Sequence, residues 1–104
     1  MEFLVEFEIN IPEGASDSEV NMREAAEARA AARLVDEGHL ARVWKAPAAP
    51  GQTKTLGLYR AESETELDDL LSALPLYDWM RISVTPLGSH PNDPAAAEAH
   101  GGVR

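Results

Sequence analysis

Residues 2–11, EFLVEFEINI, alternate between apolar and polar side chains. The apolar set is Phe3, Val5, Phe7, Ile9 and Ile11. In an extended chain these side chains share one side, and the glutamates between them share the other. A repeat of two residues over this length predicts a strand with one buried face. Pro12 and Gly14 end the pattern, so the chain begins with one strand of a sheet that packs on a single side.

An amphipathic helix is predicted to begin at about residue 17 and to end at Gly38. Ser16 and Glu19 have the spacing of a capping box at its start. Glycine at its end adopts the left-handed backbone conformation without strain. The side chains expected to face the core are Val20, Ala31, Leu34 and Val35. They fall within about a third of the helix circumference, which is the usual width of a buried stripe.

Glu27 projects into the middle of this stripe, where an apolar residue is expected. Loss of hydration there would raise the pKa of its carboxyl and make it a competent proton carrier near neutral pH. Arg23 lies one turn earlier, at a spacing that favours an ion pair with Glu27. Glu27 is therefore either a proton carrier or half of a structural ion pair, and the spacing alone does not separate the two.

The rest of the chain predicts two strands at residues 39–46 and 53–61, a second helix and a last strand at 80–87. The second helix has a capping box at Ser63 and Glu66, and its leucines recur every three or four residues. The order β-α-β-β-α-β predicts an α+β, ferredoxin-like fold, in which two helices cover one face of a four-stranded antiparallel sheet. The other face is expected to pair with a second copy in a dimeric α+β barrel. The domain is placed at residues 1–88, and residues 89–104 are expected to form a tail that is partly disordered or covers a neighbouring subunit.

Composition excludes several kinds of partner. The net charge of −9 argues against nucleic acids and anionic membranes, and the chain has no cysteine for disulfides or thiolate chemistry. No stretch has the length of a membrane span or the pattern of a signal peptide, so a cytoplasmic protein is expected. The histidines lack metal-ligand spacing, and no phosphate-binding or nucleophile motif occurs. We therefore expect no metal and no cofactor, with a small molecule as substrate.

Candidate substrate-binding residues follow the first helix. Arg42 and Trp44 share one face of their strand, where the arginine could bind a carboxylate or simply stack on the tryptophan at the surface. Tyr59, Tyr77 and Trp79 either line a pocket or belong to the core. Lys45, His39 and His90 complete the set of expected substrate-binding residues.

The segments EAAEARAAARLVDEG, RVWK, LPLYDWM and PLGSHP resemble, in this order, those of the muconolactone δ-isomerase family, over residues 1–91. The resemblance implies a ferredoxin-like subunit that assembles into homo-oligomers, from dimers up to decamers. It also implies cofactor-free isomerisation of muconolactone to the enol-lactone of 3-oxoadipate, in aromatic hydrocarbon catabolism. The family's proton-carrying glutamate corresponds to Glu27.

On this hypothesis Glu27 removes a proton from the lactone and returns it to a nearby carbon, while Arg42 and Tyr59 stabilise the dienolate oxygen. Two alternatives remain at the level of sequence. One is a related cofactor-free isomerase, cyclase or dehalogenase that acts on another lactone or a polyketide-like compound. The other is a non-catalytic ligand-binding or assembly module on the same scaffold.

Overall fold

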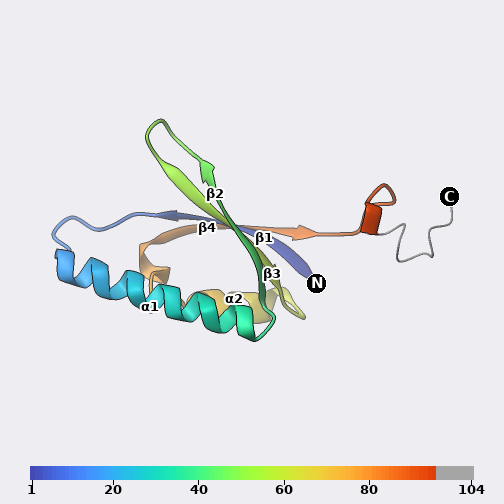
Figure 1. Ribbon diagram of the computed structural model, residues 1–104, viewed down its shortest axis with the longest axis horizontal. Helices are drawn as coiled ribbons and strands as arrows, with labels where there is room; N and C mark the ends of the chain where they lie inside the picture. The colour runs from blue at the N-terminus through green and yellow to red at the C-terminus, as the bar shows by residue number, and fades with distance from the viewer. Residues whose placement is uncertain (96–104) are drawn as a thin grey trace.

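The computed structural model describes residues 1–95 (Figure 1). Its elements are β1 (Glu2–Ile9), α1 (Asp17–Asp36), β2 (Leu40–Pro47), β3 (Thr53–Arg60), α2 (Glu64–Ser72), the 3₁₀ turn η1 (Tyr77–Trp79) and β4 (Met80–Leu87). This order confirms the predicted β-α-β-β-α-β arrangement. The prediction for the tail concerns residues 89–104, of which 96–104 lie outside the described part, and it stays a prediction.

The four strands form one antiparallel sheet in the order β2-β3-β1-β4. Both helices lie on the same side of this sheet, and the β2–β3 hairpin extends beyond the part that they cover (Figure 1). The fold is therefore the predicted ferredoxin-like α+β fold. We call the side towards the helices the helix face and the opposite side the open face.

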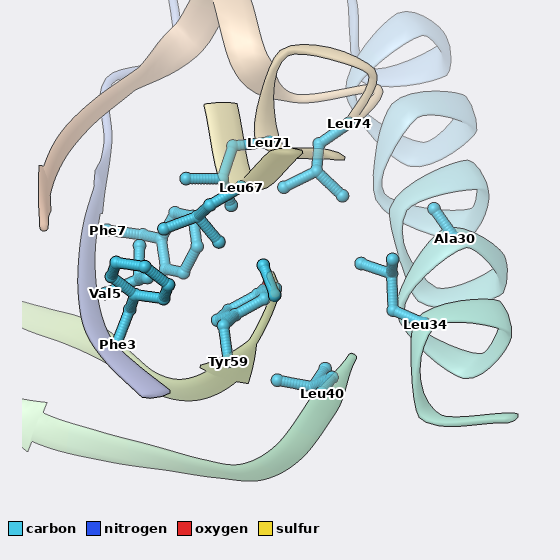
Figure 2. Close-up of a cluster of buried hydrophobic side chains, with 11 residues drawn as sticks. Phe3, Val5, Phe7, Ala30, Leu34, Leu40, Tyr59, Leu67, Leu71 and Leu74 are labelled. Carbon is cyan, nitrogen blue, oxygen red and sulfur yellow. The ribbon is translucent and has the colours of Figure 1, made fainter. Parts of the chain in front are cut away.

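The core fills the space between the helix face and the two helices (Figure 2). Its main members are Phe3, Val5, Phe7, Tyr59, Leu34, Leu67, Leu71 and Leu74. The alternation of β1 is confirmed up to Phe7. Ile9 and Ile11 are 47% and 53% exposed, because β1 pairs with β3 only as far as Phe7 and the strand ends at Ile9.

Helix α1 has the predicted ends. The Ser16 hydroxyl accepts a hydrogen bond from the Glu19 amide, and Gly38 has a φ of 82° after the last turn. The buried side chains of α1 are Ala30 and Leu34. The expectation for Val35 was wrong, since it is 54% exposed. Ala30 and Leu34 lie four residues apart on one face, and this face meets the core in place of one through Val35.

The open face carries apolar side chains from three strands. Cross-strand partners place Leu4 opposite Leu58 and Trp44 opposite Leu56, all of them on this side. Two ion pairs join β1 to β3 here, Lys54–Glu6 at 2.7 Å and Arg60–Glu2 at 3.0 Å. Among residues 1–95 no helix covers this face (Figure 1).

No helix of that part of the chain is long and apolar enough to cross a membrane.

Candidate active site

Glu27 lies half-buried on α1, beside the connection from α2 to β4. Its Oε1 accepts a hydrogen bond from the backbone N–H of Leu76, at 3.0 Å. Burial raises the pKa of the Glu27 carboxyl above its ordinary value, and the hydrogen bond from Leu76 opposes part of that rise. The loss of hydration that the proton-carrier hypothesis assumes for Glu27 is therefore present.

Arg23 does not form the ion pair that its spacing allowed. Its Nε lies 3.5 Å from Oε1 of Glu19, and its Nη1 donates to the backbone oxygen of Pro75 at 3.1 Å. The guanidinium also lies over the ring of Trp79, 4.4 Å from the centroid. None of the ion pairs within residues 1–95 involves Glu27. The carboxyl of Glu27 is therefore held by a neutral backbone donor and keeps its elevated pKa.

Tyr59 reaches the same region from β3. Its side chain is buried in the core, where its ring lies 6.0 Å from that of Phe7. Burial raises the pKa of Tyr59 to about 12, and the negative charge of Glu27 adds to the effect. The hydroxyl consequently stays protonated at neutral pH and can donate a hydrogen bond.

The second oxygen of Glu27, Oε2, and the Tyr59 hydroxyl have no hydrogen-bond partner within the described chain. No side-chain nitrogen or oxygen of that part is both fully buried and unpaired, so both oxygens retain contact with solvent. Each of these two oxygens therefore has hydrogen-bonding capacity that no group of residues 1–95 uses.

A pocket of about 300 Å³ lies between the first half of α1 and the sheet. It is lined by Phe7, Ile9, Ile11, Val20, Glu24, Thr53, Thr55 and Trp79. The carboxylate in its wall is that of Glu24, and Glu27 lies one helical turn further along α1. Phe7 joins the two regions, because it lines the pocket and contacts Tyr59.

Arg42 and Trp44 share a face, as predicted, but it is the open face. The Arg42 guanidinium lies 5.0 Å from the centroid of the Trp44 ring, which is the surface stacking considered above. Within one subunit the sheet separates this pair from Glu27 and Tyr59. Lys45 alternates to the other side of β2 and is exposed.

The remaining predicted residues lie at separate places. His39 donates from Nδ1 to the backbone oxygen of Arg60 at 2.8 Å, after the end of α1. His90 accepts at Nδ1 from the Asn92 amide, in an exposed turn after β4. Tyr77 is 43% exposed, whereas Trp79 is buried and lines the pocket.

Three groups near Glu27 were not among the site residues predicted from the sequence. They are the Leu76 amide, the Pro75 carbonyl and the Glu24 side chain. The positions of the two backbone groups cannot be inferred from the pattern of side chains. Glu24 flanks the same stripe as Glu27, and that proximity was the available indication. No group of three potential metal ligands occurs within residues 1–95.

The family model and the related sequences all indicate the same family. The family model described as muconolactone delta-isomerase matches residues 1–93. Muconolactone Delta-isomerase of Cupriavidus pinatubonensis is 32% identical over 92 residues, which span 88% of this chain and 97% of that protein. Muconolactone Delta-isomerase 1 of Acinetobacter lwoffii is 33% identical over 95 residues, with 88% and 93% of the two chains covered.

Two solved structures have the same fold. A crystal structure of muconolactone isomerase matches with a TM-score of 0.79 and 28% identity, over 90% of this chain and 95% of that one. A 5-chloro-2-hydroxyhydroquinone dehydrochlorinase from Burkholderia phenoliruptrix matches with a TM-score of 0.62 and 16% identity, over 89% and 99%. At 16% identity the second match shows the fold alone. The family model and the relatives together show that this chain is an enzyme of the isomerase class and belongs to the muconolactone delta-isomerase family.

Proposed function

We propose that this chain is a cofactor-free isomerase that moves a proton on muconolactone, with Glu27 as the proton carrier. The observation that carries the proposal is the state of the Glu27 carboxyl. It is half-buried, it forms no ion pair with a cation of residues 1–95, and burial raises its pKa. A carboxylate whose pKa is raised is a stronger base than an ordinary carboxylate, and this favours its taking up a proton. The relatives' names supply the substrate.

The reaction requires one group that acts first as a base and then as an acid. Glu27 Oε2 takes a proton from a ring carbon that is conjugated with the lactone carbonyl through the C=C bond. The C–H electron pair moves into the ring, and the negative charge collects on the carbonyl oxygen as a dienolate. Glu27 then returns the proton to the carbon next to the carbonyl. The double bond has moved, and no atom is gained or lost.

Tyr59 is the donor that stabilises the dienolate oxygen in this mechanism. Its hydroxyl stays protonated because its pKa is about 12. A hydrogen bond to a developing negative charge is stronger than one to a neutral carbonyl, so the donor favours the intermediate over the substrate. The arrangement on the helix face supports Tyr59 in this role, whereas Arg42 lies on the open face of the same subunit.

The test compares two carboxylates one turn apart on α1. Glu27→Gln keeps an oxygen that can accept from the Leu76 amide but removes the titrating group. We expect kcat for muconolactone to fall by a factor of roughly 100 or more. Glu24→Gln removes the carboxylate in the pocket wall and should act mainly on KM. Asp36→Asn, on the exposed side of the same helix, serves as the control.

Full turnover in Glu27→Gln would contradict the proposal. Loss of turnover in Glu24→Gln with full turnover in Glu27→Gln would transfer the carrier's role to Glu24. Circular dichroism of each variant separates loss of chemistry from loss of fold.

We also propose that two copies pair through their open faces. Leu4, Leu56, Leu58 and Trp44 form an apolar surface there, and surfaces of this kind are unfavourable in water. Sedimentation equilibrium should show that Leu58→Lys dissociates the assembly, whereas Thr65→Lys on the exposed side of α2 does not. An unchanged mass for Leu58→Lys would contradict this pairing.

A further inference from the structure

Two side chains of α1 hold the two polar groups of a single peptide unit. The carbonyl of Pro75 and the N–H of Leu76 belong to the same peptide bond. Arg23 Nη1 donates to that carbonyl at 3.1 Å, and that N–H donates to Glu27 Oε1 at 3.0 Å. The connection between α2 and β4 is thereby attached to the helix at both sides of one bond.

The geometry of a helix and of a peptide makes this arrangement specific. Arg23 and Glu27 are four residues apart, which places them on one face and about 6 Å apart along the axis. In a trans peptide the C=O and N–H point in opposite directions. A peptide unit that lies beside the helix can therefore accept from one side chain and donate to the next. Burial of the flanking Leu74 and Leu76 fixes the connection at this position.

The contact with Arg23 also affects the contact with Glu27. A guanidinium bound to the carbonyl draws electron density from the amide, which makes the N–H a better donor. Since the N–H occupies Oε1, the other oxygen, Oε2, is left for proton transfer. Arg23 is itself held in place, by the ring of Trp79 and the carboxylate of Glu19.

We propose that Arg23 is a positioning residue for the proton carrier. It acts through the Pro75–Leu76 peptide, which presents its N–H to Oε1 of Glu27 and so determines that Oε2 moves the proton. This inference rests on the proposed function in taking Glu27 as the carrier. It differs from a role for Arg23 in binding the substrate's carboxylate, and the two roles give different measurements.

The experiment measures the peptide itself as well as turnover. The variants are Arg23→Gln, Arg23→Lys, which keeps a cationic donor, and the control Arg29→Gln on the exposed side of α1. Amide hydrogen exchange of Leu76 is followed by NMR in the substrate-free protein. In Arg23→Gln we expect exchange at Leu76 to be roughly tenfold faster, since a hydrogen bond to a charged group is weakened. Arg23→Lys should recover part of the protection, and Arg29→Gln should match the parent protein.

Kinetics then separate the two roles of Arg23. A positioning role lowers kcat and moves the acidic limb of the pH profile to higher pH, with KM nearly unchanged, because the hydrogen bond that favours the charged carboxylate is weakened. Unchanged Leu76 exchange together with a raised KM would overturn the proposal in favour of substrate binding. If Glu27→Gln retains turnover, the proposed function fails, while the Leu76 exchange in Arg23→Gln still decides whether Arg23 holds the peptide. Arg23→Lys keeps the test decisive if Arg23→Gln does not fold.

Discussion

The ring of Tyr59 lies directly over the backbone of Gly57, two residues earlier on β3. A Cβ at position 57 would come within 2.6 Å of Tyr59 Cε1 and 3.2 Å of Cδ1. Real Cβ atoms do not approach neighbours this closely, so any larger residue displaces the ring. The missing side chain at Gly57 thus gives Tyr59 the space to lie along its own strand, within range of the Glu27 charge.

Gly57→Ala should therefore affect both stability and the proposed active site. We expect the free energy of unfolding to fall by about 1–3 kcal/mol, as for other overpacked cores, and kcat to fall because the Tyr59 hydroxyl moves. Urea unfolding and steady-state kinetics measure the two effects. Gly88→Ala is the matched control, since a Cβ there meets nothing within 4 Å. Equal behaviour of the two alanine variants would show that the ring adjusts without consequence.

Removal of the Tyr59 hydroxyl separates chemistry from packing. In Tyr59→Phe the ring and its contact with Phe7 remain, and the lost hydroxyl has no hydrogen-bond partner within residues 1–95. Stability should change by no more than about 0.5 kcal/mol. The dienolate loses its donor, so kcat should fall by a factor of roughly 100. An unchanged kcat would remove Tyr59 from the mechanism.

The pocket beside α1 can be tested by filling it. Thr55 lines the pocket from the helix face of β3, opposite Phe7 in the strand register. Thr55→Leu adds bulk to a volume of about 300 Å³ and should raise KM with a smaller effect on kcat. Thr65→Leu, on the exposed side of α2, provides the control. If KM stays the same in Thr55→Leu, the substrate binds elsewhere.

Much of the fold could be predicted because its determinants are local. The alternation of β1, the Ser16 and Ser63 caps and the glycine at position 38 each depend on residues near in sequence, and they set the element order. The same local pattern placed Glu27 on the inner side of α1. The rotation of that helix was harder to predict. Its alanines give a weak apolar signal, so Ala30 was missed and Val35 was wrongly included.

The partners of the site residues depend on contacts between distant segments. Nothing in the Arg23–Glu27 spacing indicates that the Pro75–Leu76 peptide lies beside both side chains. The face of β2 on which Arg42 lies could not be predicted from the sequence either. Its strand alternates weakly, and an irregularity between Leu40 and Arg42 changes the register by one residue. Such a change moves every following side chain to the other face.

The raised pKa of Glu27 makes a prediction about stability that does not depend on the substrate. The folded protein holds this proton more tightly than the unfolded chain, whose carboxyl titrates near the ordinary value of 4.5. The contribution of Glu27 to stability is therefore fully present below that value and is lost as the pH rises through the folded-state pKa. Glu27→Gln mimics the protonated form at every pH and can still accept from Leu76. Denaturant unfolding across this range should show the parent protein losing stability relative to Glu27→Gln as the pH rises. Asp36→Asn, in which an exposed carboxylate is removed, should show no such divergence, and parallel curves for Glu27→Gln and the parent would contradict the raised pKa.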